Sequence, residues 1–244
     1  WLSAGRVQSV ALRIIVERER EIAKFAKVEF WEVEGEFESA KQLIKAKLVS
    51  KDGVKYEQSQ TIELFDGSYT YSKTSISNKE VVDGIVGDLN PPAGGPFTIS
   101  AVDKKEVKRN PAPPYTTSTM QIDAGRRLGY TSKRIMQIAQ NLYEEGVITY
   151  HRTDSVNLST KFLGAAKIYI EKTYGKEYSQ YRTYSTKSKL AQEAHEAIRP
   201  TDVYSVPENI AYKNDWRSED IRLYEMIWKR AVASQAAAAI FDAT

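Results

Sequence analysis

The chain has 244 residues, of which 41% are hydrophobic and 27% charged, and this composition predicts a soluble protein of one large or two smaller domains. No apolar run approaches the ~20 residues that a membrane span requires, and no signal peptide opens the sequence, so we expect a cytoplasmic protein without membrane contact. The absence of cysteine excludes disulfides and thiolate catalysis, and the two histidines are too few for a histidine-built metal site. A net charge of +3 permits nucleic-acid binding but does not argue for it.

Residues 3–21 predict a helix. Ser3, Ala4 and Gly5 lie at its start, where free backbone N–H groups can receive an anion. Arg6 and Arg13 share a polar face, which is either an ordinary solvated face or, beside that start, a phosphate-binding cradle. The apolar stripe consists of Val7, Val10, Ala11, Ile14, Ile15 and Ile22, and the polar face of Arg6, Gln8, Ser9 and Arg13.

Residues 28–109 change to a period of two, which is typical of half-buried strands. Trp31, Val33 and Phe37 alternate with glutamates, and Asp52-Gly53 stands between strand-like flanks as a hairpin signal. Residues 97–102 predict another strand. The region is therefore interpreted as an antiparallel β-domain, and the proline-rich segment 110–115 as its boundary, because proline is excluded from helix interiors and central strands.

Helical patterns dominate the remainder. One helix is expected to end at Gly129, and the next to run from Thr131 or Ser132 as N-cap to Gly146. Residues 147–150 then predict a strand, and this order suggests a winged-helix or helix-turn-helix arrangement. Further helices are expected from Ser159 to Gly175, within 189–202 where Pro200 stops it, and from a cap at Ser218, followed by a strand that begins near residue 239. The first residue is Trp and the last strand has only begun, so we expect an internal piece of a longer protein.

The sequence GVITYHRTDS at 146–155 contains a candidate nucleophile, Tyr150, among fifteen tyrosines. Residues i and i+2 of a strand share a face, so Arg152 can point where Tyr150 points if the strand continues. A phenol needs a nearby cation or base to attack at neutral pH, and the planar fork of arginine also matches two phosphate oxygens. Thr153 and Asp154 add polar groups, and Ser155 is expected to form a turn. The alternative is a strand tyrosine that buries its ring.

His195 lies in QEAHEAIRP. A zinc-protease motif would need a second histidine at position 199, which is Arg, so that interpretation is rejected. A helix-face histidine with satisfied hydrogen bonds and a phosphate contact or proton carrier both remain open.

Three motifs occur together along nearly the whole chain: LSAGRVQSVALR at 2–13, ITYHRTDS at 148–155 with PYTTSTMQ upstream, and EAHEAIRPTD at 193–202. The set resembles the type IA DNA topoisomerases, most closely the bacterial topoisomerase I group. The resemblance implies that Tyr150 attacks single-stranded DNA and becomes joined to its 5′ phosphate, that Arg152 holds the scissile phosphate, and that His195 supports binding and cleavage. The implied DNA-binding residues are Ser3, Ala4, Gly5, Arg6, Val7, Gln8, Arg13, Arg152, Thr153 and Asp154.

The resemblance also implies an α+β fold. Residues 1–27 would belong to the domain that cradles the single strand, 28–109 to the first part of a β arch, 110–233 to the helical domain that carries the tyrosine, and 234–244 to the returning arch strand. Mg²⁺ would be held by acidic residues of an N-terminal Toprim domain that this chain lacks, and no metal would be bound by the chain itself. The expected partners are single-stranded and negatively supercoiled DNA, acted on by a monomer without ATP.

Two other functions remain open from the residues alone. The helix–turn–helix–strand order would also fit a non-catalytic winged-helix DNA-binding module. An interaction module in which Tyr150 belongs to the core is the third possibility.

Overall fold

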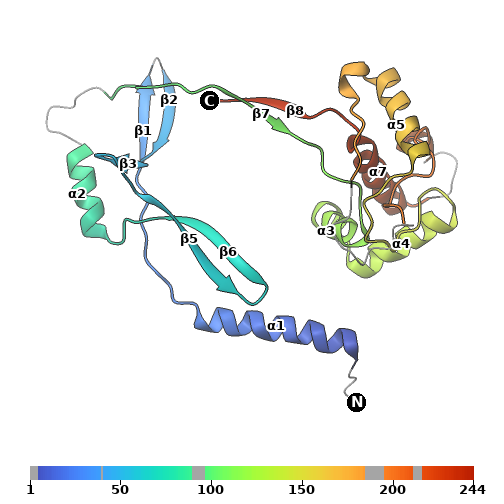
Figure 1. Cartoon of the computed structure of the whole chain (residues 1–244), viewed down its shortest axis with the longest axis horizontal. Helices are drawn as coiled ribbons and strands as arrows, with labels where there is room; N and C mark the ends of the chain where they lie inside the picture. The colour runs from blue at the N-terminus through green and yellow to red at the C-terminus, as the bar shows by residue number, and fades with distance from the viewer. Residues whose placement is uncertain (1–4, 40, 90–96, 185–194, 211–215) are drawn as a thin grey trace. The chain divides into compact units, whose positions relative to one another are not determined.

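The computed structural model describes residues 5–39, 41–89, 97–184, 195–210 and 216–244. The chain divides into two compact units, residues 1–99 and 100–244 (Figure 1). Each unit mixes helices with two-stranded antiparallel pairs, so the predicted α+β class is confirmed.

The first unit begins with the predicted helix. It is followed by hairpins whose strands pair with their sequence neighbours (Figure 1). The predicted Asp52-Gly53 turn is confirmed, since both residues have positive φ, 50° and 80°, as a tight hairpin turn requires. The apolar stripe of the helix is exposed, with Val7 81% accessible. The elements are α1 (Arg6–Lys24), β1 (Glu34–Ser39), β2 (Gln42–Lys47), β3 (Ser50–Lys51), β4 (Val54–Lys55), β5 (Glu57–Leu64), β6 (Gly67–Thr74) and α2 (Lys79–Leu89).

Two expectations for this region are wrong. Helix α2 lies where only strands were expected. The Asn78 side chain caps its first turn by accepting a hydrogen bond from the Val81 N–H at 3.0 Å. The helix was not predicted because its sequence, KEVVDGIVGDL, is rich in valine and glycine, which disfavour helices. Residues 97–102 form no strand, because none of the described residues pairs with them and all six are exposed.

Most of the helices expected for the second unit are present, with caps close to the predicted positions, but the helix expected within 189–202 is not found in its described part, 195–202. Thr131 caps α4 by accepting a hydrogen bond from the Arg134 N–H, and Ser159 caps α5 in the same way. Gly129 and Gly146 both have positive φ, as glycines that end helices commonly do. The N-cap position of the last helix is Arg217, not Ser218, and the Arg217 N–H donates to the Asp220 carboxylate at 3.1 Å. The elements are β7 (Lys105–Arg109), α3 (Thr117–Leu128), α4 (Ser132–Glu144), α5 (Thr160–Thr173), a 3₁₀ turn (Lys176–Tyr178), α6 (Pro207–Ile210), α7 (Ser218–Ala233) and β8 (Ala239–Ala243).

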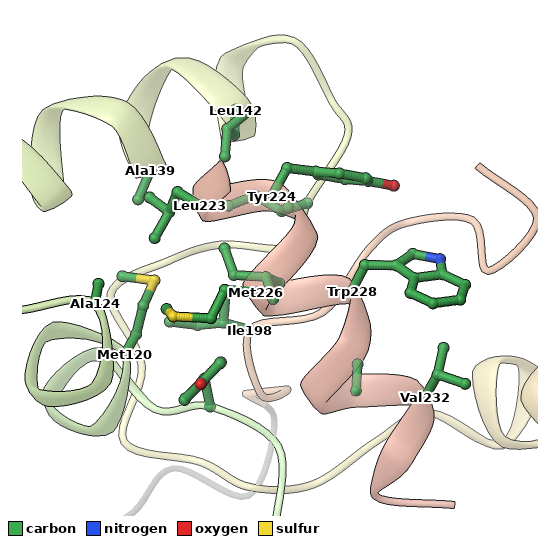
Figure 2. Packing of buried hydrophobic residues seen from close by; sticks show 14 of the residues in the cluster. Met120, Ala124, Ala139, Leu142, Ile198, Leu223, Tyr224, Met226, Trp228 and Val232 are labelled. Atoms are coloured by element: carbon green, nitrogen blue, oxygen red, sulfur yellow. The ribbon is translucent and has the colours of Figure 1, made fainter. Parts of the chain in front are cut away.

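The core of this unit is built around α7. Figure 2 shows Leu223 of α7 next to Ala139 and Leu142 of α4, and all three are buried. Buried Met120 from α3 and Ile198 from the chain between α5 and α6 belong to the same cluster. Burying aliphatic side chains of this size contributes ~1.5–3 kcal/mol each, so this core fixes the loops that leave its helices.

Strand β7 pairs with β8 along five residues each, from Lys105↔Ala243 to Arg109↔Ala239 (Figure 1). This pairing explains why the compact units divide at 99/100 and not at the prolines of 110–115. The assignment of residues to family domains stays a prediction.

Candidate active site around Tyr150

Tyr150 follows helix α4 on a short extended segment. The expected strand at 147–150 is wrong: Ile148 makes a single bridge, opposite Pro200. The ladder does not extend because the N–H groups that would continue it bond elsewhere, that of Val147 to the Leu142 carbonyl and that of Arg199 to the Thr149 hydroxyl. The argument that a strand aligns Tyr150 with Arg152 therefore fails, because residues 150–152 are not in a strand. The Tyr150 side chain is nonetheless 46% exposed, so it is not a core tyrosine.

The loop after Tyr150 is held by Thr117, in the first turn of α3. The Thr117 hydroxyl donates to the carbonyl of His151 at 2.7 Å and accepts from the Thr153 N–H at 2.9 Å. The backbone N–H of Thr117 donates to the Thr153 carbonyl, also at 2.9 Å. One threonine thus fixes the backbone on both sides of Arg152, whose own side chain is exposed.

Replacing Thr117 with valine should destabilise this loop, because the backbone groups of residues 151 and 153 would face a methyl group. We expect a loss of ~1–3 kcal/mol in the free energy of unfolding and faster hydrogen exchange at the Thr153 amide. Thr117→Ser keeps the hydroxyl and is the matched control. Denaturant unfolding together with hydrogen exchange measures both effects, and equal stability of the two variants would contradict this role of Thr117.

The segment that carries His195 lies beside the one that carries Tyr150. The Thr149 hydroxyl donates to the Ala197 carbonyl at 2.7 Å, and the Thr149 N–H donates to the Arg199 carbonyl at 2.9 Å. The Ala197 N–H reaches the Asn157 carbonyl at 2.8 Å. Ala197, two residues after His195, is therefore hydrogen-bonded to Thr149 before the 150–155 loop and to Asn157 after it.

An ion pair next to His195 reinforces this placement. Glu196 and Arg199 lie 2.6 Å apart, and the Arg199 guanidinium also stacks on the Phe162 ring at 4.9 Å. Burial alone would raise the pKa of Glu196, but the hydrogen bond and charge of Arg199, with the hydrogen bond from Ser159, hold that pKa below its usual value. The carboxylate thus links the His195 segment to the start of α5.

Tyr150, Arg152 and His195 therefore come from two segments that are bonded to each other, and all three side chains are exposed. Among the described residues, no hydrogen bond connects these three side chains directly. His195 is not in a helix as expected; the remainder of that predicted helix, 189–194, lies outside the described residues.

The polar residues after Arg152 divide into two kinds. Thr153 and Ser155 are buried, and their hydroxyls accept hydrogen bonds from the N–H groups of Ser155 and Asn157, at 3.0 and 3.1 Å. The turn expected at Ser155 is thus confirmed. Asp154 is exposed, so it is the one of these three residues whose side chain is accessible to a ligand.

Three aromatic rings form a cluster at Tyr150. The Tyr150 ring lies 5.2 Å from the Tyr143 ring and 5.4 Å from the His151 ring, both at 65°, and Tyr143 and His151 are 6.0 Å apart. Such edge-on contacts are worth ~0.5–1.5 kcal/mol per pair. His151 is completely buried, and neither of its ring nitrogens has a hydrogen-bond partner among the described residues.

The second set of predicted residues lies at the start of α1, in the first unit. Gly5 is the N-cap, and no side chain caps the helix among the described residues. The first turn carries no acidic residue, so its N–H groups and dipole remain suited to an anion. Val7, Gln8 and Arg13 are exposed, while Ser3 and Ala4 lie outside the described residues.

Mg²⁺ has no evident site in the described part of the chain, where no three acidic or histidine side chains gather closely enough to hold a metal ion. None of the described helices is long and apolar enough to cross a bilayer.

Sequence reasoning missed the supporting residues of this site. Thr117 and Thr149 act through hydrogen bonds to segments more than thirty residues away, which no local pattern reveals. Thr117 does lie in the PYTTSTMQ motif, and this was the available signal. The burial of His151 had no local signal, since it depends on contacts with Thr117 and Tyr143, which are distant in the sequence or on another element.

Comparison with known proteins agrees with the motifs. A family model of DNA topoisomerases matches residues 1–244. The chain is 44% identical to DNA topoisomerase 1 of Xylella fastidiosa strain 9a5c over 100% of the chain and 29% of that protein, and 42% identical to the Zymomonas mobilis protein of the same name over 99% and 18%. It therefore spans less than a third of the length of these relatives.

A solved structure of full-length topoisomerase I from Thermotoga maritima matches 99% of the chain and 35% of its own length, with a TM-score of 0.59 and 28% identity. The mixed fold with antiparallel strands is similar to that structure. From the family match over its whole length and from these relatives, the chain belongs to the type IA DNA topoisomerases, in the group of bacterial topoisomerase I.

Proposed function

We propose that this chain is the central part of an ATP-independent type IA topoisomerase that cuts one DNA strand, lets a second strand pass and rejoins the first. The observation that carries the proposal is the half-exposed Tyr150, held next to exposed Arg152 on a loop that is bonded to the His195 segment. A solvent-accessible phenol two residues from an arginine, on a loop whose backbone is held by hydrogen bonds, is suited to attack a phosphodiester.

The reaction consists of two transesterifications. The Tyr150 oxygen attacks the phosphorus and gives up its proton, the bond to the 3′ oxygen breaks, and the strand is left with a free 3′ hydroxyl and a 5′-phosphotyrosine. The hydroxyl then attacks back and releases the tyrosine. The number and type of ester bonds are conserved, so no ATP is needed. Arg152 stabilises the charge that develops on the phosphoryl oxygens, and His195 contacts the DNA near it.

Mg²⁺ and the acid for the departing 3′ hydroxyl are assigned to the acidic residues of the full-length protein's Toprim domain. The sequence supports this assignment of the acidic residues to another domain: no two of its eleven aspartates are separated by a single residue, so the Asp-x-Asp pattern of the Toprim domain is absent from it. DNA, single-stranded and negatively supercoiled, is the proposed partner, and a monomer is the proposed state.

The full-length protein incubated with a labelled single-stranded oligonucleotide and Mg²⁺ tests the proposal. After denaturation, the 5′-phosphate fragment should migrate with the protein and the other fragment should carry a free 3′ hydroxyl. Tight duplex binding with no adduct would support the alternative, a winged-helix binding module, and would contradict the proposed function.

Arg6 provides a separate prediction for the DNA-binding role of the α1 start. Arg6→Ala in the full-length protein should weaken binding to all single-stranded sequences alike, and the slope of log K against log salt should fall by about 0.7 for the lost phosphate contact. Arg18→Ala is the control, because Arg18 is on the same helix but is paired with Asp66 at 2.9 Å. An unchanged slope for Arg6→Ala would mean that Arg6 makes no phosphate contact and belongs to an ordinary solvated helix face.

A further inference from the structure

His151 is an unusual residue for its position. It is completely buried, and both ring nitrogens lack a hydrogen-bond partner among the described residues. A buried polar ring without partners destabilises a fold relative to an apolar ring of the same shape. Packing alone would therefore favour phenylalanine here, and what His151 offers its neighbours is its ring and not its nitrogens.

His151 contacts the proposed nucleophile Tyr150 and also the residues that surround it. Its ring lies edge-on to Tyr150 at 5.4 Å and tilted to Tyr143 at 6.0 Å, and its carbonyl accepts a hydrogen bond from the Thr117 hydroxyl. Tyr143 lies in the last turn of α4, whose inner face is in the core. The Tyr150 ring thus contacts a buried residue and a residue of a packed helix, while Tyr150 as a whole stays 46% exposed.

We propose that Tyr143 and His151 are positioning residues that hold the ring of Tyr150 in the orientation from which its oxygen attacks DNA. The proposal rests on the proposed function of Tyr150. It assigns neither residue a contact with DNA, and it requires only the ring of Tyr143, not its hydroxyl.

His151 can do this only while it is neutral. Burial lowers its pKa below the usual value, the charge of Arg152 lowers it further, and Glu144 acts in the opposite direction. A protonated ring would be a buried cation beside Arg152, with no hydrogen-bond acceptor among the described residues. Because the unfolded chain takes up this proton at a higher pH than the folded chain, stability should fall as the pH drops through the usual histidine range of about 6.5 and level off below the lowered folded pKa.

Single-turnover cleavage of an oligonucleotide by the full-length protein tests the positioning. Tyr143→Leu removes the supporting ring at a partly exposed site, so the fold should survive; at saturating DNA, cleavage should slow about ten- to a hundredfold while the DNA dissociation constant stays unchanged. Tyr143→Phe keeps the ring and should cleave at the parent's rate. Equal rates for the leucine and phenylalanine variants would overturn the proposal.

His151→Phe separates ring packing from nitrogen chemistry. The variant should cleave close to the parent's rate at pH 8 and unfold at a higher temperature. Between pH 7 and pH 5 its stability should fall less than that of the parent. Slow cleavage by a stable His151→Phe protein would overturn the positioning role and give the nitrogens a chemical one. If the unmodified full-length protein forms no covalent adduct, the proposed function is wrong. If it does form the adduct and Tyr143→Leu forms it equally fast, only the positioning role of Tyr143 and His151 is wrong.

Discussion

Tyr150→Phe in the full-length protein is expected to abolish the covalent DNA adduct completely, because the substitution removes only the oxygen that forms the phosphotyrosine bond. The ring keeps its contacts with Tyr143 and His151. Since the Tyr150 side chain is 46% exposed, the free energy of unfolding should change by less than about 0.5 kcal/mol. Single-strand binding should also be kept, because the phosphate contacts assigned to Arg6 and Arg152 remain.

The control for this experiment is Tyr143→Phe, which removes a hydroxyl from the neighbouring ring. It should still form the adduct on a denaturing gel after incubation with oligonucleotide and Mg²⁺. An adduct in the Tyr150→Phe protein would mean that another residue attacks. A large loss of stability in the same variant would mean that the hydroxyl is structural.

The second large effect concerns the 244-residue chain by itself, which we expect not to relax negatively supercoiled DNA. Tyr150 and Arg152 would face DNA without the acid that protonates the departing 3′ hydroxyl, and a positioned general acid alone contributes ~10²–10⁴ in rate. The Glu-x-Glu patterns of the chain do not replace it: Glu34, Glu36 and Glu38 lie on one exposed face of β1.

A plasmid assay with Mg²⁺ measures this, with the full-length protein as the positive control. The chain should be tested alone and with the N-terminal domain of the full-length protein added as a separate polypeptide. Efficient relaxation by the chain alone would contradict both the proposal that it is a central part and the division of labour between Tyr150 and the acidic domain.

The helices of the second unit could be predicted because their signals are local. Thr131, Ser159 and Gly129 cap or end helices through contacts within a few residues, and the apolar spacing of Ile135, Ile138 and Leu142 matches the buried face of α4. The same holds for the Asp52-Gly53 turn, where positive φ at both residues fixes the hairpin.

Features that depend on distant partners could not be predicted in this way. Residues 147–150 resemble a strand, but the Val147 N–H bonds to the Leu142 carbonyl at the end of α4, and the pairing with the segment opposite stops at one bridge. For the site, the motif pointed to Tyr150 and Arg152, while their supports come from Thr117 and Thr149, whose bonds cross more than thirty residues. His151 is buried and contacts Thr117 of α3 and Tyr143 of α4, and these contacts exist only in the tertiary structure.

The most direct measurement is to locate the DNA attachment on the protein. The full-length protein should be trapped with a short oligonucleotide by denaturation, digested with trypsin and nuclease, and the nucleotide-bearing peptide sequenced by mass spectrometry. Cleavage after Arg134 and Arg152 should yield the peptide that ends in GVITYHR, with the phosphate mass on Tyr150. A nucleotide attached to any other of the fifteen tyrosines, or to a residue that is not a tyrosine, would contradict the claim that Tyr150 is the nucleophile.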